Sequence, residues 1–208
     1  MLNTKLIPNI IILLLGICAI SFGAALFILS NIGSDPFNVF MQGLSNVGGL
    51  SIGQFNVIVS FIYVVIIFFW DRTYLKLGTL ISLVTLGPGI DYSIYLLEPL
   101  FSTQVAYWIK FVSMMIGSCF ISFGVALIYS AKIGMVPNDT LPVIMSDKLS
   151  LPFKWVRVAY DVSVVIIGVI LGGIFGIGTI FCALATGPLI AFFLPYVEKM
   201  SAKTITKI

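Results

Sequence analysis

Three charged side chains fall inside otherwise apolar stretches of this sequence, which makes them candidates for binding chemistry. Asp91 and Asp161 lie deepest, and Arg157 stands four residues before Asp161, on the same face of a helix. A carboxylate at such a depth in a bilayer costs on the order of 2.5–3.5 kcal/mol, so it requires a partner or a wet cavity. Arg157 and Asp161 are therefore expected either to form a structural ion pair or to line a polar site. Asp91 has no partner in its own stretch, and it is the first candidate for binding a proton or cation.

Two short polar segments carry the other side chains that are suited to binding. Each contains a proline and leads into a short helix, predicted at 36–46 and 139–148. About ten residues at 1.5 Å each span roughly 15 Å, half a bilayer. Such helices either lie along the membrane interface with ordinary caps, or dip inward and direct their positive N-terminal ends to a central site. The candidate binding residues of these segments are Asp35, Asn38, Asn138 and Asp139.

Two Gly-Pro pairs fall near the middle of long apolar stretches. Proline removes a backbone donor and clashes with the preceding turn, so each pair predicts a helix break with free carbonyl groups. Thr85 and Thr186 stand beside the pairs and can satisfy such groups. The alternative is a pair of packing kinks, whereas interrupted helices at corresponding places in two halves point to a transport site. The predicted substrate-binding set therefore also contains Thr85, Gly87, Pro88, Thr186, Gly187 and Pro188.

The composition argues against several other kinds of chemistry. Of 208 residues, 60% are hydrophobic and 9% are charged, against roughly 25% charged in a soluble domain, so the predicted surrounding is the lipid bilayer. The absence of histidine removes the commonest general base and metal ligand, and the three cysteines lack metal-ligand spacing. The net charge of +3 is scattered over loops without a basic patch. We therefore expect no enzyme activity, no catalytic residue, no metal, no cofactor and no nucleic-acid partner.

The elements that must position these residues are apolar stretches long enough to cross a bilayer. They predict an all-α membrane protein with six transmembrane helices. The spans are expected at about Leu6–Leu29, Phe55–Trp70, Leu77–Leu97, Val105–Tyr129, Pro152–Leu171 and Ile174–Val197.

The chain is predicted to be a tandem duplication. Segment 16–26 (GICAISFGAAL) returns at 117–127 (GSCFISFGVAL) with an offset of 117 − 16 = 101, and eight of the eleven positions are identical. The two Gly-Pro pairs are offset by 187 − 87 = 100. The predicted units are a first repeat at 1–100 and a second repeat at 101–208, each with three spans and a short helix after its first span.

The predicted repeats are inverted, because three spans per repeat make the second one enter the bilayer the other way up. Nearly all cations outside the spans fall on one side of the six-span path, which predicts that both termini are cytoplasmic. The cations on that side are Lys5, Arg72, Lys76, Lys132, Lys148, Lys154, Arg157, Lys199, Lys203 and Lys207.

Each copy of the repeated segment carries two glycines seven residues apart, on one helix face. They are Gly16 and Gly23 in the first copy, and Gly117 and Gly124 in the second. Small residues let helix backbones approach closely in lipid. We expect the first and fourth spans to pack on each other at these glycines; the alternative is that the glycines line a pore.

The motifs resemble those of the bacterial YczE/YyaS/YitT-type membrane proteins. They are SFG-x-AL at 21–26, IG-x-x-P at 32–36, the LSIG turn at 50–53, and GIGT-x7-GP at 176–188 in the second copy. The second copy departs from the pattern at 149–153, where the glycine of the turn is missing. The resemblance covers nearly the whole chain and implies a bacterial plasma-membrane protein, but it implies no activity.

Two functions fit these expectations. The first is a transporter or facilitator of an unknown small solute or ion, with its site between the inverted repeats. The second is a membrane scaffold or an accessory subunit of a larger complex. A homo-oligomer or another membrane partner is compatible with either.

Overall fold

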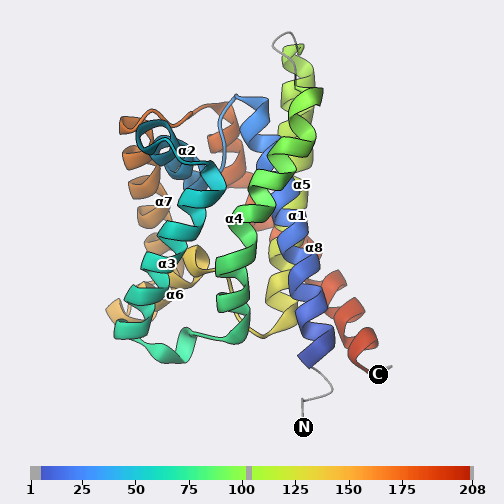
Figure 1. Cartoon of the computed structure of the whole chain (residues 1–208). Helices are drawn as coiled ribbons and strands as arrows, with labels where there is room; N and C mark the ends of the chain where they lie inside the picture. Colours follow the sequence, from blue (N-terminus) through green and yellow to red (C-terminus); the bar gives the residue numbers. More distant parts are fainter. Residues whose placement is uncertain (1–5, 102–104, 207–208) are drawn as a thin grey trace.

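The computed structural model describes residues 6–101 and 105–206, and this part of the chain is helical throughout, without a β-strand (Figure 1). In chain order the elements are α1 (Leu6–Ser30), α2 (Pro36–Gly48), α3 (Ile52–Trp70), η1 (Arg72–Tyr74), α4 (Leu77–Leu97), η2 (Glu98–Leu100), α5 (Tyr107–Ala131), α6 (Pro137–Leu149), α7 (Phe153–Ile170) and α8 (Ile177–Thr206). The predicted all-α class is thus confirmed. Two of the predicted cytoplasmic cations, Lys5 and Lys207, lie outside the described residues.

Within the described residues, five helices are long and apolar enough to cross a membrane. They are α1, α3, α4 together with η2, α5, and the part of α8 up to Ser201. The fifth predicted span corresponds to α7, whose 18 residues carry three charges. These charges, on Lys154, Arg157 and Asp161, set α7 apart from the other five helices.

The centre of the fold is the pair of helices α1 and α5, which run antiparallel side by side (Figure 1). A Cβ atom placed on Gly16 would lie 2.8 Å from the carbonyl oxygen of Gly124, and one on Gly23 would lie 2.6 Å from that of Gly117. Only glycine permits this approach, because no side chain separates the two backbones. The predicted packing contact of the first and fourth spans is therefore confirmed.

Each central helix is followed by a loop that reaches the other half of the chain. The amide of Gly178, in the first turn of α8, donates to the carbonyl of Ile32 at 3.0 Å. The amide of Gly78, in the first turn of α4, donates to the carbonyl of Ile133 at 2.7 Å. These two hydrogen bonds satisfy N–H groups that a helix start leaves without an intrahelical partner. They also fix where α2 and α6 begin.

The short helices have the starts that the sequence predicts in one case only. Asp35 caps α2, accepting a hydrogen bond from the amide of Asn38 at 3.1 Å, and Pro36 occupies the first turn. In α6, Pro137 again occupies the first turn, but Val136 stands at the cap position and no side chain caps the helix. The polar side chains at 35 and 38 therefore belong to a capped helix start, whereas those at 138 and 139 belong to a helix start without a side-chain cap.

The predicted helix breaks at the two Gly-Pro pairs do not occur. Helix α4 continues through Pro88, and α8 continues through Pro188 and Pro195. A proline removes one hydrogen bond, and the flanking turns of a long helix that packs on its neighbours hold the helix together across that point.

The two halves differ in how their last two long helices pack. Helix α3 lies against α4, because Gly53 and Gly87 bring the backbones so close that a Cβ on Gly87 would be 2.3 Å from the carbonyl oxygen of Gly53. Helices α7 and α8 form no such contact, and no described atom lies within 4 Å of a Cβ placed on Gly187. At the offset of 101, Gly53 corresponds to Lys154 (53 + 101 = 154), whose long side chain cannot permit a similar approach.

Candidate functional site

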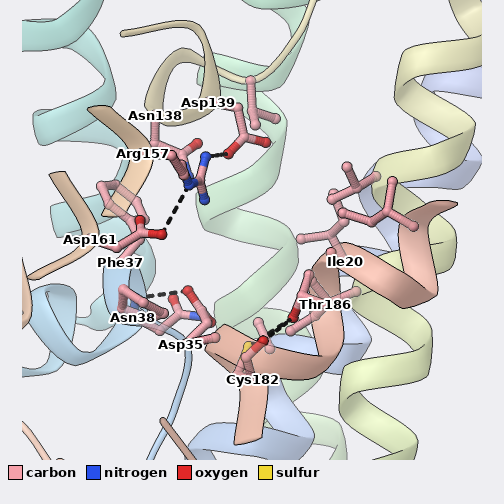
Figure 2. Close-up of a pocket in the computed structure, with 18 of the residues that line it drawn as sticks. Ile20, Asp35, Phe37, Asn38, Asn138, Asp139, Arg157, Asp161, Cys182 and Thr186 are labelled. Atoms are coloured by element: carbon pink, nitrogen blue, oxygen red, sulfur yellow. Dashed lines mark hydrogen bonds and ion pairs between the residues drawn. The ribbon is translucent and has the colours of Figure 1, made fainter. Parts of the chain in front are cut away.

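A cavity of about 390 Å³ lies beside the middle of the long helices (Figure 2). Ile20 and Ala24 contribute to it from the middle of α1, and Ile121 and Val125 from the middle of α5. Its size is that of a small-molecule site. Eight of the thirteen predicted binding residues line it: Asp35, Asn38, Asn138, Asp139, Arg157, Asp161, Thr186 and Gly187.

Both short helices direct their N-terminal ends to this cavity. Asp35 and Asn38 come from the start of α2, and Asn138 and Asp139 from the start of α6. Because these ends meet side chains from the middle of α1 and α5, the arrangement favours short helices that dip inward over helices that lie along the interface. The partial positive charge of a helix N-terminus, roughly half an elementary charge, is therefore directed at the cavity from two elements.

Arg157, on α7, forms two ion pairs, one with Asp139 on α6 and one with Asp161 within α7 (Figure 2). Its Nη1 lies 2.8 Å from a carboxylate oxygen of Asp139, and its Nε lies 3.0 Å from one of Asp161. The Asp139 side chain is only 11% exposed, so this charge depends on the guanidinium for compensation. The predicted pairing of Arg157 with Asp161 is present, but Asp139 is an equal partner that sequence spacing does not predict.

Asp35 has a different environment from the two carboxylates beside Arg157. It accepts hydrogen bonds from the backbone and the side-chain amide of Asn38. No cation of the described residues forms an ion pair with it. The cavity therefore contains one carboxylate that is hydrogen-bonded but not neutralised by a side chain.

Asn56, on α3, is a lining residue that the sequence analysis missed. It is 1% exposed, and its Oδ1 has no hydrogen-bond partner in the described structure. The Oδ1 of Asn138 also lacks a partner. A buried polar atom without a partner is unusual in a folded protein, because leaving it unsatisfied costs about 1–3 kcal/mol.

The internal repeat contains the signal that identifies Asn56. Adding the offset of 101 to 38, 56 and 60 gives 139, 157 and 161, so neutral side chains of the first half correspond to the charged triad of the second. Ser60 is 2% exposed, like a core residue. The neutral side chains are Asn38, Asn56 and Ser60, and the charged ones are Asp139, Arg157 and Asp161.

The opposite wall of the cavity is apolar. In Figure 2 the labelled acidic residues and Arg157 lie on one side, and Ile20 lies on the other. Thr186 adds little polarity to that wall, because its hydroxyl donates to the carbonyl of Cys182 at 2.7 Å. The aliphatic lining residues of α1, α4, α5 and α8 are Ile20, Ala24, Leu86, Ile90, Ile121, Val125, Ala183 and Ile190, and the other apolar lining residues are Pro36, Phe37, Val136 and Phe153.

Asp91 does not line the cavity, and the expectation that it has no partner is wrong. Its carboxylate accepts a hydrogen bond from the hydroxyl of Ser51 and one from the amide of Gly53 at 2.8 Å. Both donors belong to the start of α3, so Asp91 caps that helix from the neighbouring α4. The close Gly53–Gly87 contact between α3 and α4 brings them together, and no local sequence pattern reveals it.

Four other predicted binding residues also lie outside the cavity lining. Gly87 is occupied by the contact with α3, and the hydroxyl of Thr85 donates to the carbonyl of Ile81 at 2.7 Å, within its own helix. The carbonyl that Pro88 leaves without a backbone donor lies four residues before the proline. Thr85 therefore does not satisfy that carbonyl. The four residues are Thr85, Gly87, Pro88 and Pro188.

A second cavity of about 440 Å³ lies near the ends of α4 and α5, and Tyr129 lines both cavities. Lys76 and Lys132 line it, so it has a positive character that the first cavity lacks. Tyr129 also packs against two of the apolar core clusters. The two cavities thus lie on either side of one aromatic side chain.

Beside this end of the molecule, η1 is tied to α6. The Nζ atom of Lys148 lies 2.9 Å from a carboxylate oxygen of Asp71, and Tyr74 donates a hydrogen bond to Asp147. The Thr73 hydroxyl and then Lys148 lower the pKa of the exposed Asp71 carboxyl to about 2. This contact lies away from the first cavity and offers a matched control for mutations there.

The described residues contain no group of three histidine, cysteine, aspartate or glutamate side chains that could hold a metal ion. The chemistry that the first cavity offers is therefore binding by carboxylates, amide oxygens, one guanidinium and an apolar wall.

Comparison with known proteins places the chain in a family. Residues 7–195 match the model of a family of unknown function, DUF6198. The chain belongs to this family. The uncharacterized membrane protein YczE of Bacillus subtilis is 30% identical over 181 residues, which cover 86% of this chain and 82% of that protein. An uncharacterized protein of Haemophilus influenzae is 28% identical over 92% of this chain and 86% of its own length. The uncharacterized protein YyaS of Bacillus subtilis is 28% identical over 89% and 92%.

These relatives confirm the resemblance that the sequence motifs indicate. Together with five apolar helices of spanning length, they identify this member of the DUF6198 family as a multi-pass membrane protein. No solved structure matches the chain.

Proposed function

We propose that this protein is a transporter or facilitator of a small solute, with its binding site in the first cavity. The observation that carries the proposal is the position of that cavity: it is partly polar, it lies beside the middle of α1 and α5, and the N-terminal ends of both short helices border it. Half-helix ends beside a central chamber are typical of transport sites in membrane proteins.

The helix bounds support an inverted repeat of three spans each. Adding 101 to the bounds of α1 and α2 gives those of α5 and α6, and adding 100 to Leu77 gives the start of α8. The antiparallel contact of α1 with α5 is the relation that inversion requires, and the hydrogen bond from Gly78 to Ile133 has a counterpart in the one from Gly178 to Ile32. The units at 1–100 and 101–208 are therefore the two halves between which a solute would bind.

In this proposal α7 is the sixth span. Its 18 residues extend about 27 Å at 1.5 Å each, close to the thickness of a hydrocarbon core. Arg157 and Asp161 are directed to the cavity, so they do not oppose insertion as lipid-facing charges would. Helix α1 begins and α8 ends at the same end of the molecule (Figure 1), which supports two cytoplasmic termini.

Reconstitution tests the transport function directly. Purified protein in liposomes should give flux of at least one member of a panel of amino acids, organic acids, amines, sugars and inorganic ions. Ala183→Phe, which fills the cavity, should reduce this flux at least tenfold, whereas Ala191→Phe, on an exposed part of α8 outside the cavity lining, should leave it unchanged.

Equal flux of the two variants, or no flux for any solute of the panel, would contradict the proposal. In the second case, purification of a stoichiometric membrane partner would favour the scaffold or accessory-subunit function. Neither function in this proposal includes an enzymatic step.

A further inference from the structure

We propose that the first cavity binds an organic cation, a protonated amine with an apolar body. This inference rests on the proposed transport function and names its substrate class. It follows from three features of the cavity: the balance of its charges, the kind of hydrogen-bonding atom left without a partner, and the separation of its polar and apolar walls.

The charged residues that line the cavity are predominantly acidic. One guanidinium faces three carboxylates, which gives a formal charge of 1 − 3 = −2 for the described lining residues. Arg157 uses its two ion pairs on Asp139 and Asp161, so it leaves no cation for Asp35. The start of α2 offers Asp35 only roughly half an elementary charge and the donors of Asn38. A bound cation would neutralise the remaining negative charge of Asp35.

Two buried acceptor atoms of the lining residues have no hydrogen-bond partner in the described part of the chain. Asn56 is 1% exposed, and its Oδ1 atom has no hydrogen-bond partner. The Oδ1 atom of Asn138 has no hydrogen-bond partner either. Both side chains line the same cavity as Asp35. An ammonium group has up to three N–H donors and no acceptor, so it matches a carboxylate and amide oxygens.

The apolar wall determines what the rest of the ligand must be. Aliphatic side chains of α1, α4, α5 and α8 line the cavity, and Figure 2 shows Ile20 of α1 across from the labelled charged residues. A hydrated inorganic ion would leave this wall against water, whereas an apolar body would bury it at about 25 cal/mol per Å². The absence of a close α7–α8 contact leaves space on the same side for a body larger than a methyl group.

The test compares three ligands of one shape and different charge. Isothermal titration of the full-length protein in detergent micelles would use 2-phenylethylamine, which is protonated at pH 7, then neutral 2-phenylethanol and anionic 3-phenylpropanoate. We expect the ammonium compound to bind at least tenfold more tightly than the other two. Asp35→Asn should weaken ammonium binding at least tenfold, while Asp71→Asn, at the surface, should leave it unchanged.

Asparagine at 35 retains the cap of α2, since its amide oxygen still accepts from the backbone of Asn38. Asn56→Leu is a second variant that removes an acceptor without changing charge, and it should also weaken ammonium binding. Equal binding of all three compounds, preference for the carboxylate, no ammonium binding, or ammonium binding that Asp35→Asn leaves unchanged would each overturn the inference. Charge-selective binding without flux in liposomes would refute the transport function but not the preference for a cation. Flux of a neutral solute without charge-selective binding would refute the preference for a cation but not the transport function.

Discussion

Replacement of Arg157 by asparagine, compared with neutralisation of the whole charged triad, measures how much an unpaired charge lowers the free energy of unfolding. Arg157 holds Asp139 and Asp161 at 2.8 and 3.0 Å, and its loss leaves two carboxylates side by side without a cation. At the positions that correspond at the offset of 101, the first half of the chain has the neutral side chains Asn38, Asn56 and Ser60. A triple variant, Asp139→Asn, Arg157→Asn and Asp161→Ser, copies that neutral set into the second half.

The structure gives the expected size of both effects. Breaking a buried ion pair costs about 3–5 kcal/mol, whereas replacing all of its members by neutral residues is often neutral or stabilising. Asp139 is 11% exposed and Asp161 is 24% exposed, but Arg157 is 34% exposed, which moves the single variant to the lower end of that range. We expect Arg157→Asn to lose about 3 kcal/mol, and the triple variant to stay within about 1 kcal/mol of the original protein.

Both variants are measured by unfolding in a mild detergent to which sodium dodecyl sulfate is added, followed by far-ultraviolet circular dichroism. A single variant as stable as the original protein would show that the guanidinium does not compensate these carboxylates. A triple variant as unstable as the single one would refute the equivalence of the two halves at this site.

Three further predictions concern residues outside the charged triad. Gly23→Ala places a methyl group against a backbone carbonyl of α5 and should cost about 1–3 kcal/mol in the same unfolding assay, whereas Gly187→Ala, which meets no neighbour, should be neutral or stabilising. Asp91→Ala removes a cap of α3 and should cost about 1–3 kcal/mol while flux per folded molecule stays unchanged; a loss of flux without a loss of stability would restore Asp91 as a transport residue. The pKa of Asp71 is lowered from 3.8 to about 2, first by the Thr73 hydroxyl and then by Lys148, so the ionised carboxylate stabilises the fold above pH 4. The melting temperature of Asp71→Asn should therefore lie below that of the original protein at pH 7, and the difference should vanish between pH 4 and pH 2; a constant difference would contradict this assignment.

The sequence predicted what depends on periodicity and repetition. Five apolar helices of spanning length, the short helices after the first span of each half and the glycine contact of Gly23 with Gly117 all follow from local patterns or from the repeat. Four polar side chains at the starts of the short helices were assigned to the site and line it. These features need no knowledge of how distant helices pack.

The errors arise where packing between distant segments decides the outcome. Asp91 was expected to be an unpaired carboxylate because its partners lie about 40 residues away, at Ser51 and Gly53. The Gly-Pro pairs were expected to break their helices because local rules do not include the support of neighbouring helices. Asn56 was overlooked because an isolated amide within an apolar stretch has no local signature, although its repeat partner Arg157 does.

The cavity lies where the two halves of the chain differ in sequence and in packing. In the first half, Gly53 allows α3 to close against α4, and Asp91 fixes that closure through the start of α3. In the second half, the position equivalent to Gly53 is Lys154, so α7 cannot approach α8 in the same way. The space left beside α8 is bordered by Arg157 and two acidic side chains, in place of the amides and hydroxyl of the other half. We therefore expect Lys154→Gly to let α7 approach α8, which would reduce the volume of the cavity and weaken any ligand that binds there.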